Sequence, residues 1–178
     1  TAHLNGNVAV KTIAHELGHN FGLQHAGSWT CTRGGVRVQI SSSCSTSEYG
    51  DVFDAMGNVS ARHNNGWNLA KLGILGLADN VETVVADGTY TLKSALIPTP
   101  EPRILRIPRT KNESGSVTSW YYLEVRQTGG VFENVSDATT TGVSIRATAT
   151  NSSPETLLLD SEACTPTFFD APLQVGET

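Results

Sequence analysis

The chain has few charged side chains and no long apolar run, and both shortages exclude classes of protein. Charged residues make up 16% of the 178 residues, and the formal net charge is −5. An acidic chain of this kind is a poor partner for nucleic acid or for an anionic membrane. No apolar run approaches the roughly twenty residues that a membrane-spanning helix needs. With 38% hydrophobic residues, the chain can bury one good core or two small ones.

Cysteine is also scarce, with three residues in the chain. Cys31 and Cys44 enclose residues 32–43, and a disulfide closing that loop would stabilise the fold by about 3 kcal/mol on the chain-entropy model. Such a bridge fits a secreted protein, as do the few charges, although two reduced, buried thiols are the alternative. Cys164 is left over, so we expect it to stay free or to pair outside this chain.

What the chain does contain is a motif of the form HExxHxxGxxH, made by His15, Glu16, His19, Gly22 and His25. On a helix, residues four apart share a face, so His15 and His19 can bind one metal ion. Glu16 lies close enough to hydrogen-bond a water on that metal. Gly22 lets the backbone leave the helix and bring His25 back as a third ligand. Three imidazoles plus one water are typical of a catalytic zinc ion (Zn2+), whereas structural zinc sites use four protein ligands.

The residues around the first two histidines predict a helix. Val10, Ile13, Ala14 and Leu17 form an apolar stripe at helical spacing, and Asn7 is a candidate cap. An ordinary buried helix with surface histidines is the alternative, but a core stripe has no use for a glutamate beside one histidine and a second histidine one turn later. An exposed part of this stripe would favour aggregation.

Met56, the only methionine, follows the third histidine by about thirty residues, in the segment YGDVFDAMGN. A downstream methionine in a tight turn completes the metzincin pattern. The sequence of three segments, HELGHNFGLQHAG, YGDVFDAMGN and LGIL, resembles the gametolysin family of secreted metallopeptidases. The resemblance implies zinc on His15, His19 and His25, Glu16 as the catalytic base, and Met56 as a structural, apolar surface beneath the metal. It also implies a sheet before the zinc helix; since residues 1–7 are too few for one, we expect that sheet, and a signal peptide, upstream of this segment.

Other residues near Met56 have two interpretations. Asp51 and Asp54 could hydrogen-bond the second nitrogen of a ligand histidine, as carboxylates around metal sites often do. Aspartates in a glycine-containing loop are equally common as plain turn residues. Tyr49 could polarise a substrate carbonyl, but a buried loop tyrosine is the simpler expectation. His3 and His63 have no fixed spacing to the motif, so we assign them no role at the metal.

The hydrophobic pattern divides the chain into two parts, and the fold class is α+β. Residues 1–79 carry the lower part of a metzincin domain: the zinc helix, the methionine turn and a short helix at 66–73. Residues 80–178 predict an antiparallel, sandwich-like β unit, truncated at its C-terminus. The expected strands are 81–86 and 89–93, joined as a hairpin by Asp87-Gly88, then 103–109, 120–127, 142–149 and 157–159. Glu124 and Arg126 alternate on one of these strands and are expected on its solvent face.

Together these patterns predict a secreted zinc-dependent endopeptidase that uses a metal-activated water, with Glu16 as general base. Its substrates would be proteins or peptides, including extracellular-matrix or cell-wall proteins. The alternative is a non-catalytic extracellular binding module that has kept the fold, but such a module would have lost Glu16 or a ligand, and all four residues are present. We expect this segment alone to be a poor protease, because the sheet that holds the substrate would be missing.

Overall fold

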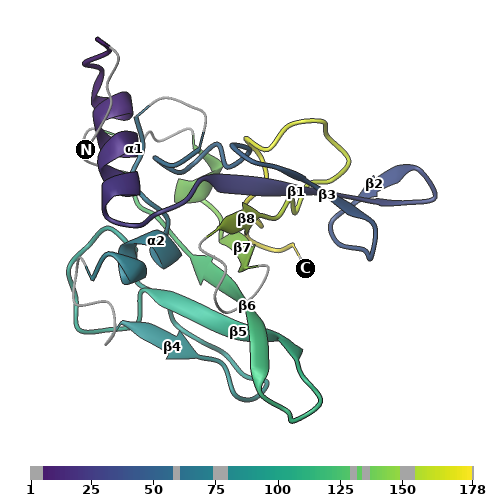
Figure 1. Cartoon of the computed structure of the whole chain (residues 1–178). Helices are drawn as coiled ribbons and strands as arrows, with labels where there is room; N and C mark the ends of the chain where they lie inside the picture. The colour runs from purple at the N-terminus through teal and green to yellow at the C-terminus, as the bar shows by residue number, and fades with distance from the viewer. Residues whose placement is uncertain are drawn as a thin grey trace.

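A computed structural model describes residues 6–57, 61–73, 80–128, 132–133, 137–148 and 155–177. They form an α+β fold with one eight-stranded sheet and two short α-helices. Both helices lie on the left of the sheet in Figure 1, on the side where the chain begins. Among these residues, no helix has the length and apolar character required to cross a membrane. The elements, in chain order, are α1 (Val10–Asn20), β1 (Ala26–Arg33), β2 (Val36–Val38), β3 (Cys44–Ser47), α2 (Gly66–Lys71), β4 (Val81–Thr83), β5 (Ile104–Lys111), β6 (Val117–Glu124), a 3-10 turn η1 (Ala138–Thr140), β7 (Ser144–Thr148) and β8 (Thr156–Leu158).

Helix α1 confirms the helix predicted from the apolar stripe, but it lies at the edge of the molecule. Gly18 is its one buried residue, whereas Val10 is 59% exposed and Leu17 43% exposed. The Asn7 side chain accepts a hydrogen bond from the Ala9 N–H at 3.0 Å, so Asn7 satisfies a backbone donor just before the helix rather than serving as its cap. The second predicted helix is also present, and the Asn65 side chain caps it by accepting from the Asn68 N–H.

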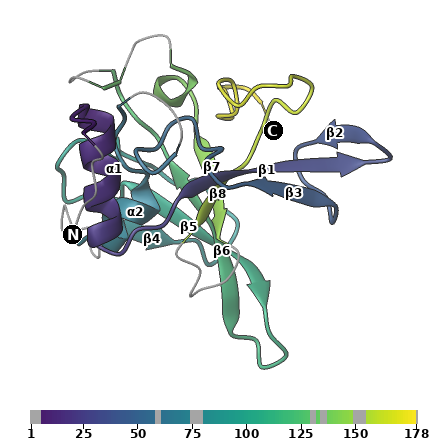
Figure 2. The ribbon, with the colours of Figure 1, turned by 45° about the horizontal axis from the view of Figure 1, so that its top comes forward.

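The sheet is mixed, with the order β2-β1-β8-β7-β6-β5-β4, and β3 pairs with β1 beside this path. The pairs β1–β8 and β4–β5 are parallel, and the others are antiparallel. The expected antiparallel sandwich is therefore wrong for the described residues, which form one sheet instead of two packed layers. Figure 2 shows two β-ribbons, β1–β3 and β5–β6, that diverge from the centre of this sheet.

The sheet joins the two predicted parts of the chain. Strand β1 belongs to the first part and β8 to the second, and Gly27 pairs with Leu157 across them. The predicted boundary at residues 79 and 80 borders residues 74–79, which are outside the described residues, so the division into domains stays a prediction. His3 is likewise outside the described residues.

The predicted hairpin around Asp87-Gly88 is wrong. Strand β4 is short and pairs in parallel with β5, with Val81 opposite Ile104, and residues 89–93 form no strand. This pairing packs Val81 against the core of Leu69, Ile104 and Tyr122, whereas Val85 stays 88% exposed. Burial of apolar area therefore outweighs the local preference of the Asp-Gly pair for a tight turn.

The solvent-face prediction for Glu124 and Arg126 is also wrong, because Glu124 is 3% exposed and Arg126 is 2% exposed. Strand β6 lies between β5 and β7, and the chain around α2 covers its end, where the Gly66 N–H donates to the Glu124 carboxylate. Burial is possible because each charge has an opposite partner. We call these five residues the buried ion-pair network: Asp51, Glu124, Arg126, Glu133 and Arg146.

The predicted disulfide is confirmed, since Cys31 and Cys44 are bonded. They lie directly opposite one another in the antiparallel pair of β1 and β3. Cys164 is an exposed free thiol, as expected.

Candidate metal centre

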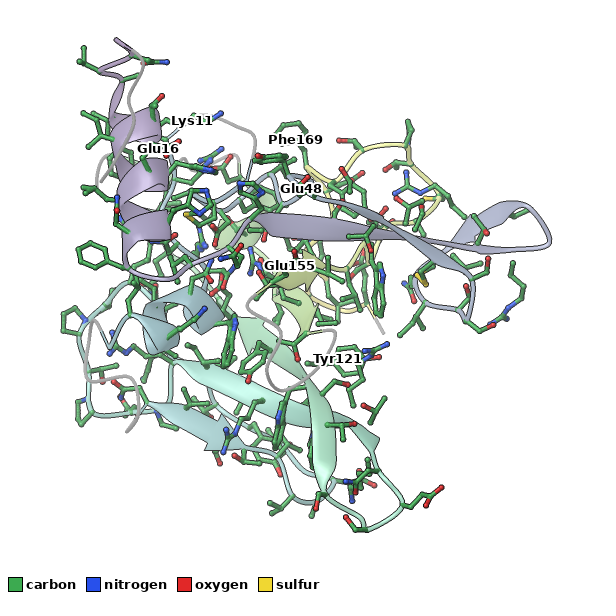
Figure 3. The ribbon with its side chains drawn as sticks, in the orientation of Figure 1. Lys11, Glu16, Glu48, Tyr121, Glu155 and Phe169 are labelled. Carbon is green, nitrogen blue, oxygen red and sulfur yellow. A yellow bond between two sulfur atoms is a disulfide. The ribbon has the colours of Figure 1, made fainter. Side chains whose placement is uncertain are left out.

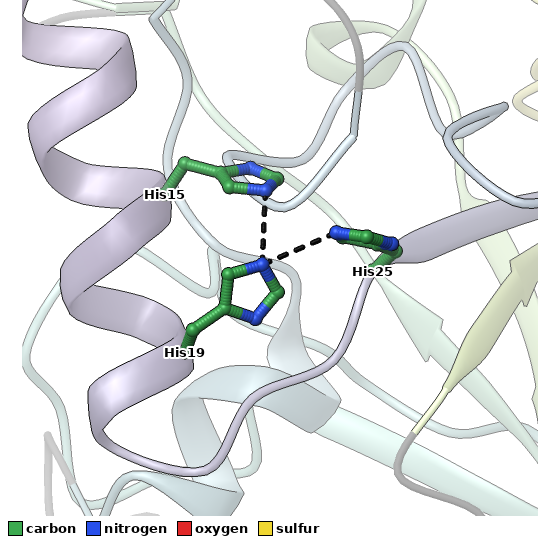
Figure 4. Close-up of side chains that lie close together, drawn as sticks. All are labelled: His15, His19 and His25. Carbon is green, nitrogen blue, oxygen red and sulfur yellow. Dashed lines mark hydrogen bonds between the residues drawn. The ribbon is translucent and has the colours of Figure 1, made fainter. Parts of the chain in front are cut away.

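The three histidines of the motif meet at one point although they come from two different backbone environments. His15 and His19 lie one turn apart on α1, and His25 directly precedes β1 (Figure 4). Between them Gly22 has φ +87°, a conformation that favours glycine, and the Leu23 N–H donates to the Gly18 carbonyl. This turn ends the helix and returns the chain toward it, as the sequence predicted.

The outer nitrogen of each ring contacts an oxygen that can only accept a hydrogen bond. His15 Nδ1 lies 3.0 Å from the Ala55 carbonyl oxygen, and His19 Nδ1 lies 3.0 Å from the Leu23 carbonyl oxygen. His25 Nδ1 lies 2.7 Å from Oε1 of Glu48. Each Nδ1 must carry the proton to make its bond. In the neutral rings, each Nε2 is therefore left with an unprotonated lone pair.

These three lone pairs face one another. His19 Nε2 is 3.2 Å from Nε2 of His15 and 3.1 Å from Nε2 of His25. Two nitrogen ligands of a tetrahedral zinc ion lie about 3.3 Å apart, given Zn–N bonds of roughly 2.05 Å. Both distances from His19 are near this value, and the ligand atoms of all three histidines lie within 4.8 Å of one another. The described residues contain no other group of three His, Cys, Asp or Glu side chains placed to hold a metal.

Burial favours the neutral, metal-binding form of the His15 ring. It lowers the pKa of His15, and the neighbouring His19 and His25 act in the same direction against the hydrogen bond to Ala55. A lower pKa at His15 weakens the competition between a proton and a metal ion for this ring.

Met56 packs against α1 at Gly18 and is fully buried in a small core with Leu23 and Ala26. Its sulfur lies so close to Gly18 that a side chain at position 18 would collide with it. Gly18 is thus required where the helix meets Met56. The expected structural role of Met56 fits this position. The Nδ1 partners of the three histidines are Ala55, Leu23 and Glu48, and not Met56.

A cleft of about 190 Å³ opens beside the histidines, lined by Lys11, Thr12, His15, Glu16, Tyr49 and Gly57. Glu16 therefore borders the same open space as one metal-site histidine, and Figure 3 shows it on α1 close to Lys11. Tyr49 is 40% exposed, which corrects the expectation of a buried tyrosine. Its ring centroid lies 3.9 Å from that of His25 and 6.1 Å from that of His15.

Among the described residues, neither aspartate hydrogen-bonds a histidine, so the metal-site interpretation of Asp51 and Asp54 is wrong. Asp51 accepts from the Phe53 N–H, and Asp54 accepts from the Met56 N–H, as turn aspartates do. Both also have long-range partners: Asp51 pairs with Arg146 at 2.6 Å, and the Asn65 N–H donates to Asp54. They shape the loop that presents the Ala55 carbonyl to His15.

The carboxylate that does contact a candidate ligand histidine is Glu48, which the motif did not predict. The spacing of the two cysteines could have predicted that Glu48 lies near His25. The Cys31–Cys44 register continues to Ser28 opposite Ser47, and one more residue along β3 brings Glu48 beside Gly27 and toward His25. His63 pairs with Glu133, 3.0 Å away, and has no part in the metal centre.

Comparisons with protein-family models, with characterised proteins and with solved structures find no match for this chain. The metzincin resemblance therefore stays a prediction from the sequence.

Proposed function

We propose that this protein is a secreted zinc-dependent endopeptidase whose metal ligands are His15, His19 and His25. The observation that carries the proposal is the convergence of three Nε2 lone pairs while every Nδ1 is held by an acceptor. Acceptor-only contacts on all three outer nitrogens orient the rings for one cation, as second partners of zinc-bound histidines do.

In this proposal His15, His19 and His25 would hold a zinc ion, which would supply a water of lowered pKa and polarisation of the scissile carbonyl. The chain supplies the other steps. Glu16, which borders the cleft, accepts a proton from the attacking water on its carboxylate and returns it to the nitrogen of the leaving amine. Tyr49 forms part of the same wall and limits how substrate and water enter. No serine or cysteine nucleophile is needed, so no covalent intermediate forms.

The wider assignments are supported by composition. The disulfide in the β1–β3 ribbon fits an oxidising compartment, which supports secretion. The acidic chain and the open cleft fit protein or peptide substrates, among them extracellular-matrix or cell-wall proteins, and nothing here favours nucleic acid.

Replacing the proposed base tests the mechanism. Glu16→Gln should keep about one zinc ion per chain but lose roughly 10²–10⁴-fold in cleavage of an unrelated peptide substrate, because the proton acceptor is gone. Metal content and turnover are measured together, before and after chelation and with zinc restored. The matched control is Glu113→Gln, an exposed glutamate in the turn between β5 and β6, which should change neither value.

If Glu16→Gln cleaved peptides at the rate of the unsubstituted protein, Glu16 would not be the base. If the unsubstituted, zinc-loaded protein cleaved nothing, the binding-module alternative would replace the enzyme.

A further inference from the structure

Glu48 differs from the other two hydrogen-bond partners of the histidine cluster. His15 and His19 are held by backbone carbonyls, and both lie on a regular helix that already fixes their direction. His25 lies outside any helix, at the entry to β1, and its Nδ1 contacts a side-chain carboxylate at 2.7 Å. The ligand with the least backbone support thus has the one charged partner.

Two consecutive residues hold the His25 ring. Glu48 contacts its Nδ1, and the Tyr49 ring lies tilted by 37° against it, with a centroid distance of 3.9 Å. Both residues directly follow β3, which the Cys31–Cys44 disulfide and the β1–β3 pairing fix opposite β1. The ribbon therefore delivers Glu48 to a fixed place beside His25.

We propose that Glu48 is a positioning residue of the metal centre, which holds His25 as the Nδ1-protonated tautomer with Nε2 aimed at the metal. The proposal rests on the proposed zinc site and extends it to a residue outside the motif. A carboxylate on Nδ1 fixes the tautomer, orients the ring and makes Nε2 a better electron donor. The Glu48 side chain is 65% exposed, so replacing it leaves the core unchanged.

The experiment compares Glu48→Ala and Glu48→Gln with the control Glu113→Ala. Zinc affinity is measured by competition with a chromophoric chelator, and Glu48→Ala should weaken it about 10- to 100-fold. Glu48→Gln keeps an acceptor oxygen without the charge, so it should fall between Glu48→Ala and the unsubstituted protein. Glu113→Ala should bind zinc as the unsubstituted protein does.

The tautomer of His25 can be measured separately, in the absence of metal. In the zinc-free protein, long-range nitrogen–proton NMR should show His25 protonated at Nδ1, and Glu48→Ala should shift it toward protonation at Nε2. His19, held by the Leu23 carbonyl, serves as the internal reference and should not change. Circular dichroism of the variants should match that of the unsubstituted protein.

The outcomes separate the two proposals. If Glu48→Ala binds zinc within about threefold of the unsubstituted protein, or leaves the His25 tautomer unchanged, the positioning role is wrong while the zinc site stands. If the unsubstituted protein binds no zinc, the proposed function fails, and Glu48 as a metal-site residue fails with it. A shift of the His25 tautomer together with weaker zinc binding supports the proposal.

Discussion

The molecule contains two clusters of ionisable side chains that differ in burial and in how their members are paired. In the buried ion-pair network, the paired side chains are at most 3% exposed, and each acid lies beside an arginine. In the histidine cluster, the three residues are half-buried, and His15 lines a cleft. The Nε2 atom of His19 faces the Nε2 atoms of His15 and His25. In the first cluster opposite charges are paired with one another, whereas the three histidine nitrogens of the second could hold a cation.

The two clusters are also connected. Arg126 donates to the Phe53 carbonyl at 2.8 Å, and Arg146 pairs with Asp51, so both arginines hold the loop that ends in Ala55 and Met56. The Ala55 carbonyl is the partner of His15, and Met56 lies under the helix. Arg126, just beyond β6, and Arg146 on β7 thus hold the loop that contacts the candidate metal centre.

Removing a ligand should affect the histidine cluster alone. We expect His19→Ala to abolish zinc binding, because two imidazoles hold a catalytic zinc poorly, while the unfolding free energy of the zinc-free protein changes by no more than about 1 kcal/mol. Elemental analysis and urea unfolding measure the two effects. His63→Ala is the control, since His63 contacts Glu133 and should leave zinc bound. Full zinc occupancy in His19→Ala would contradict the ligand assignment.

Removing an arginine should affect the buried ion-pair network first. Arg146→Met leaves Asp51 and Glu124 buried without this partner, so we expect a loss of about 3–5 kcal/mol in the free energy of unfolding by urea. Arg33→Met, an exposed change at the end of β1, should cost less than about 0.5 kcal/mol. A loss below about 1 kcal/mol for Arg146→Met would mean that the ion pairs contribute little.

The acids around the buried ion-pair network should titrate in opposite directions, which is the smallest expected effect. Burial raises the pKa of Asp54 to about 6, and the charge of Asp51 adds to this against Arg146. For Glu124, burial alone would raise the pKa, but Arg146 and Arg126 outweigh it and lower the pKa.

The contribution of Asp54 to stability is therefore complete below about pH 4 and is lost as the pH rises through about 6. That of Glu124 is present above its usual pKa and is lost in acid. Carbon NMR of the carboxyl groups should show Asp54 titrating near 6 and Glu124 still ionised below its usual range. If Asp54 titrated near its ordinary value, the inferred effect of burial would be wrong.

The sequence by itself determined the features that depend on local geometry. His15 and His19 share a helix face because the helix repeat places residues four apart together, and Gly22 ends that helix because it tolerates a positive φ. The Cys31–Cys44 disulfide could also be predicted, since a short loop between two cysteines favours closure.

Only the tertiary structure decided which distant segments meet. Glu48 reaches His25 across 23 residues, and Arg146 reaches Asp51 across 95. Alternation predicted Glu124 and Arg126 on one exposed strand face, but β6 ends at Glu124, and nothing local says that it lies inside the sheet between β5 and β7. Asp87-Gly88 failed as a hairpin signal for the same reason. Local rules fix backbone conformation and spacing, whereas burial and ion pairing depend on which strands become neighbours, and that is settled by the apolar area and charges of the whole chain.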